Sequence, residues 1–335
     1  MILYVFISLI IGLLATLLIT PKFMILLERI GLVGTDIQKL NKPSLPEMGG
    51  LPILVGTLSS IFTFIWLISF LSNDQISLVH ILAAISTIMI ITIIGILDDL
   101  SSLIKSKSFK RIGLKQWQKP LLTLPAAIPL MAIMAGQTKM SIPFIGTIEF
   151  GILYPLVLVP IAIVGASNAT NMLAGLNGLE AGLGTVILST LGIYAYVSGS
   201  IEASLIAFSV AVSLLAFLYY NWYPSKIFPG DSLTYMIGAT IATVAIIGNI
   251  EKIAFLAFIP WFIEFVLKAR SRFKAESFGK IMPNKTLEAP YNKIYSLTHI
   301  PMKLGKFKEW QISTMLIGAE IILCISILLI YIPKI

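Results

Sequence analysis

The sequence predicts an all-α, polytopic membrane protein with about ten transmembrane helices. Of its 335 residues, 57% are hydrophobic and only 12% are charged, about half the roughly 25% charged share of a soluble domain. Apolar runs long enough to cross a ~30 Å hydrocarbon core recur along the chain. This composition excludes a water-soluble enzyme and a disordered chain, and the single cysteine, Cys324, excludes a disulfide scaffold.

Ten apolar segments have the length and composition of membrane spans. The fourth contains three prolines and the fifth is short, but neighbouring helices in a membrane bundle can satisfy the backbone groups that proline frees. Apolar residues follow Met1 directly, so we expect the first segment to be a retained anchor. The expected spans are residues 2–20, 49–72, 79–97, 119–136, 151–167, 178–197, 201–219, 233–249, 251–268 and 310–332.

The basic residues predict the orientation of these spans. Ten spans place alternate loops on opposite sides, and one side receives 21 of the 24 Lys and Arg residues. The positive-inside rule then places that side in the cytoplasm and both termini outside it. The same charges would also attract an anionic substrate, so orientation and chemistry are not independent here. The expected cytoplasmic loops are about 21–48, 98–118, 168–177, 220–232 and 269–309, within a single membrane domain over residues 1–335.

Two adjacent carboxylates end the third span. Asp98 and Asp99 follow the apolar run IIGIL, and they would repel each other unless a cation or a proton is shared between them. A magnesium-phosphate site would supply such a cation. The alternative is an ordinary helix end that reaches water.

The segment NATNMLAGLNGLEAG, residues 168–182, joins two spans with three amides and three glycines. Asn168 and Asn171 share a face if this part is helical, and Gly175 and Gly178 permit close approach of the backbone to a ligand. The alternative is that small and polar residues pack helices together in lipid. Three asparagines at one membrane edge favour a binding site.

Two further polar segments belong to the same side. In FPGDS, Asp231 begins a span, and Phe228 stands where it can stack on a base; the alternative is simple turn and capping chemistry. Residues 268–309 carry ten Lys or Arg together with His299. That segment can also be a surface loop held by anionic lipid.

The motifs IIGILDD, NATNMLAGLNGLEAG and FPGDS together resemble those of the polyprenyl-phosphate N-acetylhexosamine-1-phosphate transferases. AGLNGLEAG is similar to the eukaryotic and archaeal dolichyl-phosphate GlcNAc-1-phosphate transferases, whereas bacterial members have Asp where this chain has Ala174. The resemblance implies an integral membrane enzyme of the cell membrane or endoplasmic reticulum with a cytoplasm-facing site. It implies transfer from UDP-GlcNAc to polyprenyl phosphate with release of UMP, using Mg²⁺, with Mn²⁺ as an alternative. The lipid bilayer is an implied partner and nucleic acid is not; a homodimer is left open.

The resemblance also assigns roles to individual residues. Ser102 departs from the family at a position where an acidic or amide residue is expected, and the family's basic cluster for the sugar pyrophosphate has no clean counterpart. The implied roles are metal binding for Asn171 and Asp231, catalysis for Asp98, Asp99 and Lys119, uracil recognition for Asn177 and Phe228, nucleotide contact for Glu47, further substrate binding for Asn168, and pyrophosphate binding for Arg270, Arg272, Lys274 and His299.

Two other functions compete with this interpretation. An ion-coupled transporter would also place carboxylates such as Glu180, Glu264 and Glu320 in apolar spans, but it predicts polar residues near the midplane and inverted repeats. This sequence instead collects its acids, amides and bases at one face. A phospho-MurNAc-pentapeptide-type transferase is disfavoured by Ala174.

Overall fold

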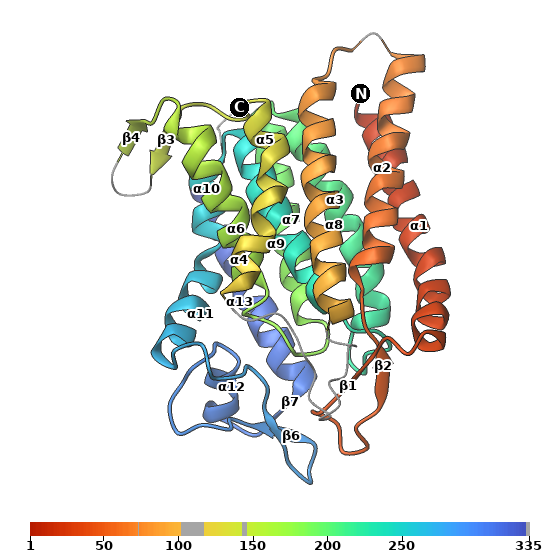
Figure 1. Ribbon diagram of the computed structural model, residues 1–335, viewed down its shortest axis with the longest axis vertical. Helices are drawn as coiled ribbons and strands as arrows, with labels where there is room; N and C mark the ends of the chain where they lie inside the picture. The colour runs from red at the N-terminus through yellow and green to blue at the C-terminus, as the bar shows by residue number, and fades with distance from the viewer. Residues whose placement is uncertain (73, 102–116, 143–145, 333–335) are drawn as a thin grey trace.

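The fold is a bundle of helices, several of them long and apolar enough to cross a membrane. The computed structural model describes residues 1–72, 74–101, 117–142 and 146–332 (Figure 1). Within these residues, seven helices are long and apolar enough to cross a membrane. The all-α polytopic membrane architecture is therefore confirmed. The seven are α1 (Ile2–Arg29), α2 (Gly50–Leu71), α3 (Leu78–Ser101), α7 (Leu179–Val197), α8 (Ile201–Asn221), α9 (Gly230–Gly248) and α13 (Glu309–Tyr331).

The count of ten spans is not confirmed, because the other three apolar segments do not form single long helices. Each contains proline, which lacks an N–H group and clashes with the preceding helical turn. Their pieces are α4 (Gln118–Thr123), the 3₁₀ turn η1 (Leu124–Ala127) and α5 (Ile128–Ala132); the π-helical turn η2 (Tyr154–Leu158) and α6 (Val159–Thr170); and α10 (Glu251–Ala257) and α11 (Ile259–Arg270).

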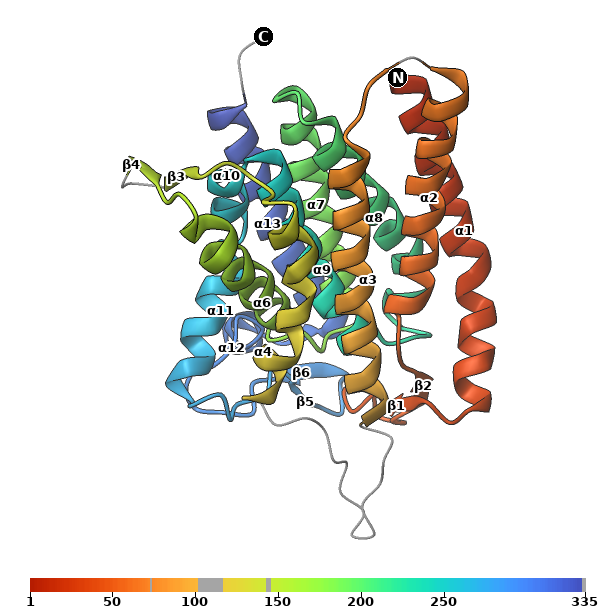
Figure 2. The same ribbon diagram turned by 45° about the horizontal axis from the view of Figure 1, so that its top comes forward.

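Short strands lie at the two ends of the bundle (Figures 1 and 2). At one end, β1 (Val33–Thr35) pairs antiparallel with β2 (Ser44–Pro46), and nearby lie β5 (Lys280–Ile281), β6 (Thr286–Glu288), β7 (Phe307–Lys308) and helix α12 (His299–Leu304). The hairpin of β3 (Lys139–Ile142) and β4 (Gly146–Glu149) lies at the opposite end, as do the N-terminus and the end of α13. The expected loop 98–118, with Ser102, falls mostly outside the described residues.

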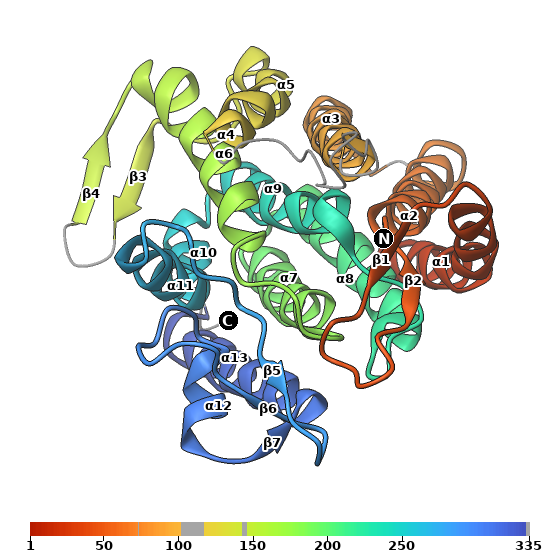
Figure 3. The ribbon, with the colours of Figure 1, turned by 60° about the horizontal axis from the view of Figure 1, so that its bottom comes forward.

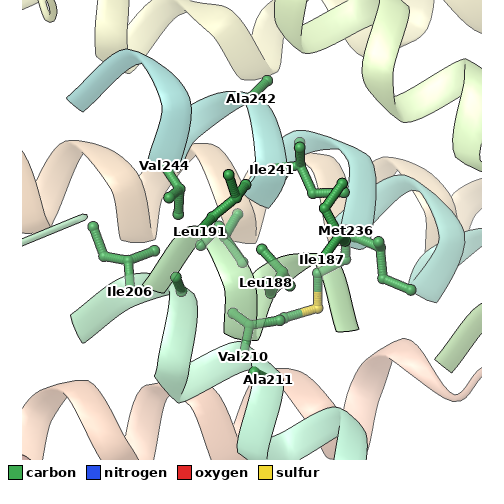
Figure 4. Packing of buried hydrophobic residues seen from close by; sticks show 14 of the residues in the cluster. Ile187, Leu188, Leu191, Ile206, Val210, Ala211, Met236, Ile241, Ala242 and Val244 are labelled. Atoms are coloured by element: carbon green, nitrogen blue, oxygen red, sulfur yellow. The ribbon is translucent and has the colours of Figure 1, made fainter. Parts of the chain in front are cut away.

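Helix α9 lies at the centre of the bundle, between α3, α6, α7 and α8 (Figure 3). Nearly every side chain of α9 is buried, as expected for a helix that is apolar on all sides. Ile187 and Leu191 of α7, Val210 of α8 and Met236 of α9 interdigitate in this core (Figure 4). The first turn of α9 is thereby held firmly at the end of the bundle where β1 and β2 lie.

Glycines bring two helices into close contact with α9. A Cβ atom on Gly95 of α3 would lie 2.4 Å from the Cα atom of Ser232, and one on Gly238 of α9 would lie 2.3 Å from the carbonyl oxygen of Ala166 in α6. Small residues allow such backbone approach between membrane helices. The ends of α3, α6 and α9, which carry the polar motifs, are consequently brought together.

Candidate active site

A cavity of about 910 Å³ lies where the polar motifs meet. Its wall is made by residues 34–38 and Glu47, by the start of α4, by the 168–180 segment, by residues 228–231, by Phe273 and by residues 275–278. Segments far apart in the sequence therefore share one cavity. The predicted site residues on its wall are Glu47, Lys119, Asn168, Asn171, Asn177, Phe228 and Asp231.

One lysine joins two carboxylates at the edge of this cavity. The Nζ atom of Lys119 lies 2.8 Å from Oδ2 of Asp98 and 2.7 Å from Oδ2 of Asp231. The hydroxyl group of Tyr235 also donates to Oδ2 of Asp98, at 2.9 Å. Because Asp98 is buried, its charge requires such partners. Helices α3, α4 and α9 thus each supply one member of a charged cluster.

The second carboxylate of the pair faces the beginning of α9. Oδ1 of Asp99 accepts the N–H group of Asp231 at 2.7 Å, and Oδ2 accepts that of Ser232 at 3.1 Å. These amides are among those that a helix N-terminus leaves without intrahelical partners. Gly230 has a φ of +68°, and a Cβ atom there would lie 2.6 Å from Oδ2 of Asp99. Asp99 therefore holds the backbone of Asp231 in place. The two adjacent carboxylates have different surroundings, because Asp98 pairs with Lys119 whereas Asp99 binds the first amides of α9.

Oxygen atoms suited to a hard divalent cation gather beside Lys119. Asn171 caps the end of α6, and its Oδ1 accepts the hydroxyl group of Thr234 at 3.1 Å. Asp231 and Asn171 supply carboxylate and amide oxygens, and Mg²⁺ usually takes one or two carboxylates together with substrate phosphates. In the described ranges no group of three His, Cys, Asp or Glu residues could form an all-protein metal cage. The donor set fits a divalent cation that would be shared with phosphate.

Asn168 lies one turn before Asn171 on α6. Its Nδ2 donates to Oγ1 of Thr123 at 3.1 Å and to the carbonyl oxygen of Val164 at 2.8 Å. Asn168 therefore fixes α6 against α4, the helix that carries Lys119.

Asn177 is a buried junction between loops. Its Oδ1 accepts both Nζ of Lys39 (3.1 Å) and the N–H group of Ser225 (2.9 Å), while its Nδ2 donates to Oδ2 of Asp36 at 3.3 Å. Its own N–H group donates to Oε1 of Glu309 at 2.7 Å. Since both lone pairs of Oδ1 have protein partners, a contact from this side chain to a nucleotide would come from Nδ2.

Phe228 and Glu47 are neighbours on the cavity wall. The two residues form an isolated parallel β-bridge, and the N–H group of Phe228 donates to the carbonyl oxygen of Pro46 at 2.8 Å. A Cβ atom on Gly34 would lie 2.8 Å from Oε2 of Glu47 and 3.1 Å from Cδ2 of Phe228. The side chains of Glu47 and Phe228, the predicted nucleotide contacts, are half-buried and both lie beside Gly34.

Comparison with known proteins decides the family. The pattern that defines glycosyl transferase family 4 matches residues 81–249. A protein of Sulfolobus acidocaldarius is 38% identical over 323 residues, which cover 96% of this chain and 94% of the relative. This chain belongs to glycosyl transferase family 4. The expected resemblance to polyprenyl-phosphate sugar-phosphate transferases is confirmed.

The relatives in family 4 carry the names of two different transferases. The Sulfolobus protein is named, provisionally, as a UDP-N-acetylglucosamine–dolichyl-phosphate N-acetylglucosaminephosphotransferase, and a Dictyostelium discoideum protein carries that name outright. The Dictyostelium protein is 29% identical over 285 residues, 73% of this chain and 67% of the relative. A phospho-N-acetylmuramoyl-pentapeptide-transferase of Halalkalibacterium halodurans is 31% identical over 255 residues, 73% of this chain and 75% of the relative.

The basic residues expected at the pyrophosphate are not brought to the cavity of this family 4 protein. The side chains of Arg270, Arg272 and Lys274 are exposed and do not line the cavity wall. His299 is fully buried, and its Nδ1 accepts the N–H group of Tyr295 at 3.3 Å. Their assignment to the pyrophosphate stays a prediction from the resemblance.

Lys268 lines the cavity, and sequence reasoning did not single it out. Only 7% of Lys268 is exposed. Its Nζ donates to Oγ of Ser277 at 2.7 Å and to the carbonyl oxygen of Ala275 at 2.9 Å, and it lies 3.7 Å from Oε1 of Glu264. The available signal was the spacing of Glu264 and Lys268, which places opposite charges on one face of a helix near its end.

Glu180, which the sequence offered as a transporter carboxylate, also belongs to this site. It lines the cavity, and its Oε1 accepts the N–H group of Gly175 at 2.6 Å. Glu180 therefore shapes the loop between α6 and α7.

Proposed function

We propose that this protein transfers GlcNAc-1-phosphate from UDP-GlcNAc to a polyprenyl phosphate of the dolichyl type, forming a lipid-linked pyrophosphoryl sugar and UMP. The observation that carries the proposal is the cavity that joins the Asp98–Lys119–Asp231 cluster and Asn171 to the aromatic wall at Phe228. The names of the Sulfolobus and Dictyostelium relatives support the same substrates.

The transfer exchanges one phosphorus–oxygen bond for another. An oxygen of the lipid phosphate attacks the phosphorus that carries the sugar, and the bond from that phosphorus to the UMP oxygen breaks, so UMP leaves with the electron pair. A phosphate monoester with a second pKa near 6 is already largely dianionic at pH 7. The acceptor therefore needs little help from a base, and catalysis depends mainly on positioning and charge neutralisation. Proton removal by Asp98 is a secondary role.

The residues of the cavity divide this work. Lys119 supplies positive charge to the phosphates, and Asp98 and Tyr235 fix its position. Asp99 holds Asp231 by its backbone. Mg²⁺, or Mn²⁺ in its place, held by Asp231 and Asn171 would neutralise phosphate oxygens when bound. Phe228 offers its ring to the uracil.

The cavity opens toward apolar surface as well as toward the charged loops. Trp117 and Phe265 line it, and their side chains are exposed. The lipid tail of the acceptor can thus remain in the bilayer of the cell membrane or endoplasmic reticulum while its phosphate reaches Lys119. The basic loops at this end favour a cytoplasmic site.

A second candidate reaction is transfer of phospho-MurNAc-pentapeptide, which the Halalkalibacterium relative favours. Ala174 lines the cavity, at a position where the family resemblance implies Asp in most bacterial members, and this disfavours the pentapeptide donor. Either donor would react by the same chemistry, so the preference for one donor depends on the shape of the cavity wall.

A donor panel tests the proposal. Purified protein with polyprenyl phosphate and Mg²⁺ should release UMP fastest from UDP-GlcNAc, more slowly from other UDP-N-acetylhexosamines and from UDP-MurNAc-pentapeptide. EDTA and Asp231→Asn should each lower the rate by about 10²-fold or more, because charge neutralisation is lost. Asp74→Asn, at the exposed far end of the molecule, is the matched control and should leave the rate unchanged. Equal rates with EDTA would contradict the metal assignment, and preference for the pentapeptide donor would select the second candidate.

A further inference from the structure

One buried amide side chain connects three loops of the cavity wall. Gln38 is 2% exposed and lines the cavity. Its Nε2 donates to the carbonyl oxygen of Gly175 at 2.7 Å, and its Oε1 accepts the N–H group of Gly279 at 2.8 Å. The first loop is thereby bonded both to the segment between α6 and α7 and to the segment after α11.

The turn around Gln38 is itself fixed. The N–H group of Gln38 donates to Oδ1 of Asp36 at 3.2 Å. The next residue, Lys39, donates to Oδ1 of Asn177 at 3.1 Å, pairs with Asp36 at 3.2 Å and forms an ion pair with Glu309 of α13. Since charged and polar contacts hold the turn next to Gln38, its side chain has little freedom to leave the two glycines.

The two loops that Gln38 joins are also packed together. Gly175 has a φ of +108°, and a Cβ atom on it would lie 2.5 Å from Cε1 of Phe278. The Phe278 ring therefore lies against the Gly175 backbone. Phe278 directly precedes Gly279, whose N–H group donates to Gln38. A primary amide offers both a donor and an acceptor, so glutamine satisfies a carbonyl oxygen and an N–H group at once, which glutamate and methionine cannot do.

We propose that Gln38 is a positioning residue that clamps these three loops and thereby sets the affinity for the nucleotide sugar. The inference rests on the proposed function. The clamped loops carry Asn177 and the residue 275–278 wall, and a cavity that is already ordered binds its ligand without the entropic cost of ordering loops. Lys119, Asp98 and Asp231 are held by other contacts, between α3, α4 and α9. Loss of the clamp should therefore raise KM for the nucleotide sugar more than it lowers kcat.

Two substitutions of Gln38 separate its two hydrogen bonds. Gln38→Met removes both, whereas Gln38→Glu keeps an acceptor for Gly279 and loses the donor to Gly175. Amide hydrogen exchange of the full chain in detergent should be faster in residues 275–281 of Gln38→Met, and parent-like there in Gln38→Glu. Asn41→Ala, exposed on the same loop, is the matched control and should exchange like the parent everywhere.

Steady-state kinetics complete the test. We expect KM for UDP-GlcNAc to rise about tenfold in Gln38→Met, as for the loss of a buried hydrogen bond, with KM for polyprenyl phosphate unchanged. If Gln38→Met has the hydrogen exchange and the KM of the parent, the proposed clamp is wrong. If KM rises equally for UDP-GlcNAc and for polyprenyl phosphate, the substitution loosens the whole protein, and the proposed clamp is wrong as well. If the parent releases no UMP, the proposed function fails and the affinity claim with it, while exchange at 275–281 still decides whether Gln38 joins the loops.

Discussion

An aromatic ring on the cavity wall can bind a base through its face, and Phe228 is placed to do so. Phe228→Ala should weaken binding of UDP by about 1–3 kcal/mol, the range for stacking a base on an aromatic side chain. Titration calorimetry of the purified protein gives this difference directly. Phe70→Ala, whose ring is 73% exposed near the opposite end of the bundle, should bind UDP like the parent. An unchanged dissociation constant in Phe228→Ala would make the ring a structural contact only.

At the scale of residues, the sequence predicted which segments form the site, but it did not predict which partner each side chain contacts. Asp98 and Asp99 were predicted as a catalytic pair, but adjacent residues of a helix point about 100° apart. Only the packing of α3 on α9 determines that Asp98 meets Lys119 and Asp99 meets the α9 amides. His299 was expected at the substrate and is buried instead, where its ring packs against Tyr291 and accepts the N–H group of Tyr295.

At the scale of elements, the contact between α3 and α9 sets the geometry of the charged cluster. Gly95→Ala would place a methyl group 2.4 Å from the Ser232 backbone, so the helices must separate. We expect a loss of about 1–3 kcal/mol of stability, the usual cost of overpacking, with a fall in kcat as Asp98 and Asp231 move apart.

Gly165 of α6 provides the matched control for that substitution. A Cβ atom on Gly165 would meet nothing within 4 Å, so Gly165→Ala should keep parental stability and activity. Thermal unfolding in detergent and UMP release measure the two effects. Parental behaviour in Gly95→Ala would show that close packing of α3 on α9 is not required.

Proline shows what the sequence predicts about elements and what it does not. The ten apolar segments were visible from composition, and seven of them are single helices. Pro125 and Pro129 marked the fourth segment as irregular, and it is divided into α4, η1 and α5. The break before Pro260, between α10 and α11, was not expected, because a lone proline in a long apolar run is often tolerated in a membrane helix.

At the scale of the whole molecule, one buried histidine couples stability to pH. Burial away from water and the nearby Lys268 ammonium group lower the pKa of His299 to about 4, below the value near 6.5 of an unfolded chain. The unfolded state then binds more protons between these values, so the free energy of unfolding falls as pH falls. The full loss is about 3 kcal/mol. It begins near pH 6.5 and is complete below pH 4.

Thermal unfolding between pH 4 and pH 7 checks this dependence. His299→Leu removes the titrating group, so its melting temperature should depend less steeply on pH than that of the parent, whatever its absolute stability. The other groups that titrate in this range are shared by both proteins and cancel in the comparison. Identical pH slopes would contradict a neutral buried His299.

The last expectation concerns which compartment the cavity faces, since a nucleotide sugar made in the cytoplasm must reach it. The N-terminus, the end of α13 and the β3–β4 hairpin lie at one end of the bundle, and the cavity loops lie at the other (Figures 1 and 2). The sequence predicts 21 of the 24 basic residues on the side of these loops, so that end should be cytoplasmic. In a Cys324→Ser background, cysteine at Lys280 should react with an impermeant thiol reagent only from the cytoplasmic side, and cysteine at the exposed Lys139 only from outside. The two positions lie on strands at opposite ends of the bundle, so labelling from the same side would contradict a membrane-spanning arrangement, and reversed labelling would place the cavity outside the cytoplasm.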